Sequence, residues 1–144
     1  MEVLIEKTKD SSEYEITIKC REIPTLLVEA LNALQKGAFL LGYMEGEIHH
    51  VALESILYLE IVDKKVFFYT GEQMFTSNQK LYQLEMALVN DSFIRVSKQA
   101  IVNLERVKNI SSYQGARLLL TLDNGEKVVV TRGFVPLLKE RLGI

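Results

Sequence analysis

The stretch Phe93–Ile110, which reads FIRVSKQAIVNLERVKNI, places cations, amides and a hydroxyl between apolar residues. The polar members of its first eleven positions are Arg95, Ser97, Lys98, Gln99 and Asn103, and the apolar members are Phe93, Ile94, Val96, Ala100, Ile101 and Val102. Apolar residues of these types are the ones most often found in a protein interior. The same short stretch is therefore expected to supply both core and contact surface.

Basic residues are concentrated in the part of the chain that contains this stretch. Through Val62 the chain has 5 Lys and Arg against 11 Asp and Glu, whereas from Asp63 onward it has 12 against 8. A basic surplus on one part of a nearly neutral protein favours a polyanionic partner such as nucleic acid. Charge counts this small also vary by chance, so composition alone leaves the partner open.

The whole sequence bounds the class of protein. Its 144 residues fit one domain of ordinary size, and its 48% apolar and 25% charged residues are typical of a globular protein. Cys20 is the single cysteine, which excludes an intrachain disulfide and a multi-cysteine metal site. The N-terminus lacks a basic start, and no segment reaches the roughly 18 apolar residues of a membrane span. We therefore expect a soluble cytoplasmic protein.

The N-terminal part predicts a hairpin followed by a helix. Residues 2–6 and 14–20 alternate apolar and polar side chains around a Ser-rich turn, which is typical of paired strands. Residues 24–36 begin with Pro-Thr and end before Gly37, and they carry an apolar stripe at helical spacing, namely Leu27, Ala30, Leu31 and Leu34. Three uses of that stripe remain open: packing on the chain's own sheet, dimerisation, or contact with a partner protein.

The rest of the chain predicts a mainly β (α+β) domain with an antiparallel sheet and one or two short helices. Short strands are expected at 38–44, 47–53, 56–62, 65–70, 72–77, 117–122 and 126–131. A helix is expected at 78–89 with Ser77 as its cap, and a terminal turn or short helix at 133–142. Asp123-Asn124-Gly125 is a strong hairpin signal. We place the boundary between an extension, 1–37, and the domain, 38–144, near Gly37.

Residues suited to catalysis are scarce. His49 and His50 are neighbours in an expected strand, so their side chains should point to opposite faces and cannot act together. Cys20 has no histidine nearby in the sequence to activate it, and is better interpreted as a small buried residue. The sequence contains no Gly-rich phosphate loop, dinucleotide fingerprint or metal-binding helix motif. We therefore expect no catalytic residue, no metal and no cofactor, and an enzyme is the least favoured interpretation.

Side chains suited to DNA contact occur near expected turns and strand ends. They are Lys64, Lys65, Arg95, Lys98, Gln99 and Arg132. Cations bind phosphates, and arginine, lysine and glutamine also read base edges in the major groove. Each of them alone is better explained as a solvated surface residue. Asn103 lies in an apolar run between Val102 and Leu104, so it is expected to hydrogen-bond the local backbone.

Phe93–Ile110, preceded by QKLYQLEMAL at 79–88 and followed by LTLDNGEKVVVTRGFVPLL at 120–138, resembles the LytTR DNA-binding domain of bacterial transcription regulators. In that family a Phe-x-Arg-x-His-Arg-Ser-like run leads into Ile-Val-Asn, and an Asn-Gly hairpin then leads to a Ser/Thr-Arg pair. The resemblance covers about Leu41 to Gly143. It implies a sequence-specific regulator of double-stranded DNA whose β scaffold inserts loops into successive major grooves, commonly at direct repeats.

The resemblance also implies which residues contact DNA. The first contact region falls on Asp63, Lys64 and Lys65, the second on Arg95, Ser97, Lys98 and Gln99, and the third on Arg132. This chain has Ser97-Lys98-Gln99 where the family often has His-Arg-Ser or His-Asn-Ser, so a base preference does not carry over. The same departure supports the alternative function, a protein-interaction or sensory module that keeps the fold without binding DNA.

The extension departs from family members that begin with a phospho-receiver domain. About 37 residues precede the domain, so we expect no switch by aspartyl phosphorylation within this chain. The hairpin and helix resemble the extension of stand-alone LytTR regulators, some of which are held in check by a small companion membrane protein. A homodimer built on the apolar stripe would also suit a repeated DNA site.

Overall fold

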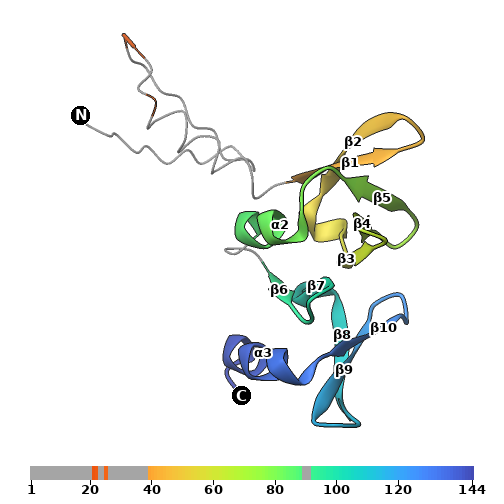
Figure 1. Cartoon of the computed structure of the whole chain (residues 1–144), viewed down its shortest axis with the longest axis vertical. Coiled ribbons are helices and arrows are strands. Elements are labelled where there is room, and N and C mark those ends of the chain that lie inside the picture. Colours follow the sequence, from red (N-terminus) through yellow and green to blue (C-terminus); the bar gives the residue numbers. More distant parts are fainter. Residues whose placement is uncertain (1–20, 23–24, 26–38, 89–91) are drawn as a thin grey trace, which may run out of the picture.

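The computed structural model describes residues 21–22, 25, 39–88 and 92–144, and two antiparallel sheets and two α-helices lie within residues 39–88 and 92–144 (Figure 1). The larger sheet has the strand order β2-β1-β5-β4-β3-β7-β6, and the smaller sheet has the order β10-β9-β8. The strands of the larger sheet are β1 (Phe39–Met44), β2 (Glu47–Ala52), β3 (Tyr58–Val62), β4 (Lys65–Tyr69), β5 (Met74–Ser77), β6 (Phe93–Arg95) and β7 (Ala100–Asn103).

The smaller sheet and the helices follow or interrupt these strands. Its strands are β8 (Val107–Tyr113), β9 (Arg117–Leu122) and β10 (Lys127–Val130). The α-helices are α2 (Leu81–Ala87) and α3 (Val135–Leu142), and short 3-10 turns lie at η1 (Leu53–Ser55), η2 (Leu104–Arg106) and η3 (Arg132–Phe134). The strands, helices and Asp-Asn-Gly hairpin that the sequence predicted from residue 38 onward are present, with ends shifted by a few residues.

Tight turns set the register of the hairpins in the larger sheet. Asp63 and Lys64 have φ angles of 49° and 65°, and they join β3 to β4 with Val62 opposite Lys65. Two consecutive positive φ angles give a turn whose twist matches that of the paired strands. This turn holds the Lys64 side chain at the tip of a hairpin.

The cap expected for helix α2 was wrong. The helix begins at Leu81 with Lys80 at its N-cap, and the Gln83 side chain accepts a hydrogen bond from the Lys80 N–H at 2.9 Å. Ser77 is the last residue of β5, and its hydroxyl accepts a hydrogen bond from the Gln79 N–H at 3.1 Å. The Ser77 hydroxyl is therefore used in the turn that leaves the strand, before the helix starts.

The larger sheet has an apolar core on each face. On one face, Leu81 and Leu84 of α2 and its C-cap residue Leu88 pack against residues that include Leu59, Phe68 and Ile101. On the other face, the β3, β6 and β7 end of the sheet packs against the smaller sheet and α3; the buried residues there include Leu57, Val96, Val102, Leu120, Val130 and Leu138. Strands β6 and β7 contribute to both cores, which explains the continuous apolar runs of the opening stretch.

Gly42 lets two aromatic rings approach the backbone of β1. A Cβ atom at this position would lie 2.7 Å from Phe68 Cζ and 2.9 Å from Phe75 Cβ. These rings are buried and stack with centroids 5.3 Å apart. Glycine at this strand position therefore serves close packing, which is one of the few reasons to place it inside a strand.

The hairpin expected within residues 2–20 and the helix expected at 24–36 lie outside the described residues. The apolar stripe of the expected helix stays a prediction. The boundary between the extension, 1–37, and the domain, 38–144, also stays a prediction. Among the residues that the structure does describe, no helix is long and apolar enough to cross a membrane.

Candidate nucleic-acid interface

Two of the predicted contact segments lie side by side at one end of the larger sheet. Strand β3 leads into the Asp63-Lys64 turn, and β7 begins beside it with Ala100 opposite Glu60. The Ile61 N–H donates a hydrogen bond to the Gln99 carbonyl at 2.8 Å. The β6–β7 loop, Val96–Gln99, is therefore next to the β3–β4 turn.

The third predicted contact segment, which contains Arg132, follows β10 of the smaller sheet and lies beside the β6–β7 loop. The Thr131 N–H donates a hydrogen bond to the Val96 carbonyl at 3.0 Å, and the Thr131 hydroxyl donates to the same carbonyl at 3.3 Å. Arg132 follows directly and begins η3. The segments that carry residues 64 and 132, which are far apart in the sequence, are thus each hydrogen-bonded to the β6–β7 loop that carries Lys98, one at Gln99 and the other at Val96.

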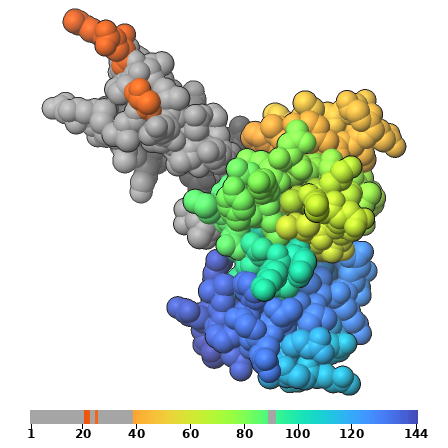
Figure 2. All heavy atoms as spheres, viewed as in Figure 1, coloured from red at the N-terminus to blue at the C-terminus, as the bar shows by residue number. Residues whose placement is uncertain are grey.

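Exposed polar side chains line this end of the fold. We call them the contact edge, and they are Lys64, Lys65, Lys98, Gln99 and Arg132. Among the described residues, none of its four cations forms an ion pair. Figure 2 shows the β6–β7 segment, in teal, at the surface between the yellow-green and blue parts of the chain. Solvated cations held on a rigid scaffold are what phosphate contact requires.

Arg95 and Ser97 differ from the contact edge because the protein itself engages their side chains. Arg95 contacts the carbonyl oxygens of Ser97 and Lys98 and the carboxylate of Glu85, and its side chain is only 17% exposed. Ser97 is 8% exposed, and its hydroxyl accepts a hydrogen bond from the Gln99 N–H at 3.2 Å. Both residues hold the shape of the loop that carries Lys98 and Gln99.

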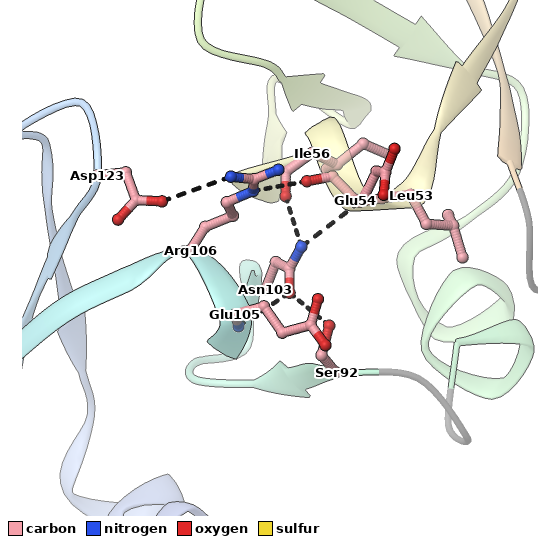
Figure 3. A network of polar contacts seen from close by, with 8 residues as sticks. All are labelled: Leu53, Glu54, Ile56, Ser92, Asn103, Glu105, Arg106 and Asp123. Carbon is pink, nitrogen blue, oxygen red and sulfur yellow. Dashed lines mark hydrogen bonds and ion pairs between the residues drawn. The ribbon is translucent and has the colours of Figure 1, made fainter.

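Asn103 is the centre of a buried polar network at the end of β7 (Figure 3). It is 1% exposed, and its amide nitrogen donates to the Ile56 carbonyl at 2.9 Å and to the Leu53 carbonyl at 3.4 Å. Its Oδ1 accepts from the Glu105 N–H at 3.1 Å and from the Ser92 hydroxyl. The expectation that Asn103 bonds the backbone is confirmed, although two of its acceptors lie about 50 residues earlier in the chain.

Arg106 is a residue that sequence reasoning missed. Its Nε donates to the Glu54 carbonyl at 2.6 Å, and its Nη1 lies 3.7 Å from Asp123 Oδ2 (Figure 3). The Asp123 N–H in turn donates to the Arg106 carbonyl at 2.9 Å. Arg106 therefore ties η1, which precedes β3, to the β9–β10 hairpin. The only local signal was a cation next to a strand end, which does not indicate its remote partners.

Tyr58, which stacks on Tyr69, forms a second link between the sheets. Tyr58 and Tyr69 are cross-strand partners with ring centroids 4.6 Å apart. Burial, followed by a hydrogen bond to Glu126 of the β9–β10 hairpin, raises the pKa of the Tyr58 hydroxyl well above its usual range. The Tyr69 hydroxyl donates to Glu60 at 2.7 Å. The two sheets are thus held in one orientation, which also fixes Arg132 relative to Lys64 and Lys98.

The two histidines lie on opposite sides of β2, as expected. His49 packs at 5.6 Å from the Phe75 ring on the core side, whereas the exposed His50 stacks on Phe39 at 4.4 Å. They cannot cooperate in catalysis. Among the described residues, no group of three or more His, Cys, Asp or Glu side chains could hold a metal ion.

Comparison with known proteins gives concordant matches. A family model described as the LytTr DNA-binding domain matches residues 46–143. An uncharacterized HTH-type transcriptional regulator of Staphylococcus aureus strain MRSA252 is 30% identical over 118 residues, which cover 82% of this chain and 80% of that protein. A regulator with the same description from strain NCTC 8325 / PS 47 has the same identity and coverage.

One solved structure gives a match to the fold. It is the LytTr DNA-binding domain of a putative methyl-accepting/DNA response regulator from Bacillus cereus, with a TM-score of 0.71 and 30% sequence identity. The match covers 74% of this chain and 98% of that one. It confirms the predicted fold class, a mainly antiparallel β domain with short helices.

Proposed function

Because the chain belongs to the family of LytTr DNA-binding domains, we propose that it is a transcription regulator that binds specific sites on double-stranded DNA. The resemblance inferred from the opening stretch is thereby confirmed. The names of the S. aureus relatives support a role in transcription. The observation that carries the proposal is the contact edge, where four exposed cations from three segments lie at one end of the fold.

The mode of contact that we propose uses loops rather than a recognition helix. Within residues 39–88 and 92–144, five strands lie between helices α2 and α3 in the sequence. These two helices therefore do not form a helix-turn-helix pair. Lys64, Lys98 and Arg132 instead project from turns and strand ends, and a β scaffold can also present side chains to a groove. In this mode Lys98 and Arg132 read bases or bind phosphate, and Lys64 and Lys65 bind the backbone of the adjacent groove.

We further propose that the DNA site is a direct repeat occupied by two copies in the cytoplasm. Residues 1–37 form an extension to the domain at 38–144 in this proposal, and the stripe of Leu27, Ala30, Leu31 and Leu34 joins the copies. The competing uses of that stripe are contact with a small companion membrane protein and packing on the chain's own sheet. Enrichment of bound duplexes from a random pool tests the arrangement, and we expect a motif repeated about 20 base pairs apart, two turns of DNA, because each copy occupies two adjacent major grooves.

The pool experiment also tests the alternative function. A domain that has kept the fold but lost DNA binding would enrich no motif. A single unrepeated motif would contradict the two-copy arrangement while leaving specific binding intact.

Salt dependence gives a second expected result. Each phosphate neutralised by a cation changes the slope of log K against log salt by about −0.9. If all four cations of the contact edge bind phosphates, the slope reaches about −3.6 per bound copy. Fluorescence anisotropy on the enriched duplex, with NaCl varied at fixed pH, measures the slope. An affinity that does not change with salt would contradict phosphate contact at this edge.

A further inference from the structure

We propose that Glu85 and Arg95 form a clamp that holds the β6–β7 loop in its DNA-binding shape. Arg95 is then a positioning residue and not a DNA contact. This inference rests on the proposed function, because it assigns a role to residues beneath the contact edge. It also reassigns Arg95, which the family resemblance placed among the contacts.

Each of the three nitrogen atoms of the Arg95 guanidinium group contacts an oxygen atom of the protein. Its Nε donates to the Ser97 carbonyl at 2.7 Å, and its Nη2 donates to the Lys98 carbonyl at 2.5 Å. Its Nη1 lies 3.1 Å from Glu85 Oε2 on helix α2. Arginine suits this position because its donors form a planar fork of fixed geometry.

Among the described residues, the other hydrogen bonds of the loop do not involve the Ser97 and Lys98 carbonyls. Val96 N–H donates to the Ala100 carbonyl at 3.0 Å, which closes the loop, and Ser97 Oγ supports the Gln99 N–H. Within the described part of the chain, Arg95 is the donor that the Ser97 and Lys98 carbonyls share. The clamp therefore fixes the two peptide groups from which Lys98 projects.

Removing the charge of Glu85 distinguishes the two possible roles of Arg95, a clamp or a direct DNA contact, because the two roles predict opposite effects on DNA binding. If Arg95 contacted phosphate, Glu85 would compete for the guanidinium and repel the DNA, so its neutralisation would strengthen binding. If Arg95 is a clamp, neutralising Glu85 weakens the charge-assisted bond that holds the fork in place. Binding of the specific site should then weaken even though the protein has lost a negative charge.

The experiment compares Glu85→Gln with wild type in the full chain. Dissociation constants are measured on the enriched duplex and on a shuffled duplex of the same length at three NaCl concentrations. We expect the ratio of specific to nonspecific affinity to fall by about tenfold, with the salt slope unchanged. Glu72→Gln is the matched control. Glu72 is exposed in the turn between β4 and β5, at the end of β4 opposite to the β3–β4 turn that carries Lys64.

Arg95→Lys provides the second variant. It keeps the charge but cannot hold two carbonyls and a carboxylate in one plane, so we expect it to lose specificity like Glu85→Gln. Glu85→Gln binding the specific duplex as tightly as wild type, or more tightly, would overturn the clamp. A parallel loss of specific and nonspecific binding, or an Arg95→Lys variant with wild-type specificity, would also overturn it. Wild-type protein without any sequence preference would instead refute the proposed function.

Discussion

Replacing Lys98 and Arg132 together with alanine is expected to weaken binding of the specific duplex by about a hundredfold or more. Both side chains are exposed and unpaired among the described residues, and the Thr131–Val96 hydrogen bonds place Arg132 beside the loop that carries Lys98. A good hydrogen-bonded pair with a base edge contributes about 1 to 3 kcal/mol of discrimination, so removing two such pairs at once eliminates most of the specificity. Anisotropy titrations at fixed salt measure the change.

A matched pair of cations separates this effect from a general loss of charge. Lys108 on β8 and Lys139 on α3 are exposed and outside the contact edge. Their double replacement by alanine removes the same charge, and we expect it to reduce specific binding only slightly. Both double variants should unfold within about 0.5 kcal/mol per substitution of wild type, as surface changes usually do. Equal losses of affinity from the two pairs would show that total charge, and not the contact edge, determines binding.

Local patterns predicted the elements of this fold because each depends on neighbouring residues. Alternation in β3 and β4 and the Asp123–Gly125 turn could be interpreted without knowledge of the rest of the chain. The cap of α2 could not, because Ser77 had two competing uses and the end of β5 decided between them. The sequence contained the right residue types for a cap, but in the structure Lys80 occupies the N-cap and the Gln83 side chain accepts a hydrogen bond from its N–H.

Residue roles within the opening stretch depended on partners in other elements. Arg95 has the same chemistry as Lys98 and Arg132, but Glu85 on α2 turns its side chain inward. No spacing rule predicts that ion pair, because one residue belongs to a helix and the other to a strand. The grouping of Lys64, Lys98 and Arg132 likewise required the strand order, which places β7 between β3 and β6.

The expected cost of Asn103→Ala is about 3 kcal/mol of unfolding free energy, from buried and partly buried groups left without a partner at about 1 kcal/mol each. The substitution removes the donor to the Ile56 carbonyl and the acceptor for the Glu105 N–H and the Ser92 hydroxyl. Urea denaturation followed by circular dichroism measures the change. The matched control is Asn109→Ala, because Asn109 is exposed on β8 and its loss should cost less than about 0.5 kcal/mol.

Asn103→Asp tests whether hydrogen bonding or packing explains that cost, because it keeps the size of the side chain and replaces the donor with an acceptor. The new carboxyl group would face the Leu53 and Ile56 carbonyls, and burial would raise its folded-state pKa above the unfolded value of about 3.9. Its folded state then binds the proton more tightly, so the variant should lose stability as pH rises from about 4 toward 7. Wild-type stability serves as the reference at each pH. A variant whose stability difference from wild type does not change over this range would contradict the buried hydrogen-bond network around Asn103.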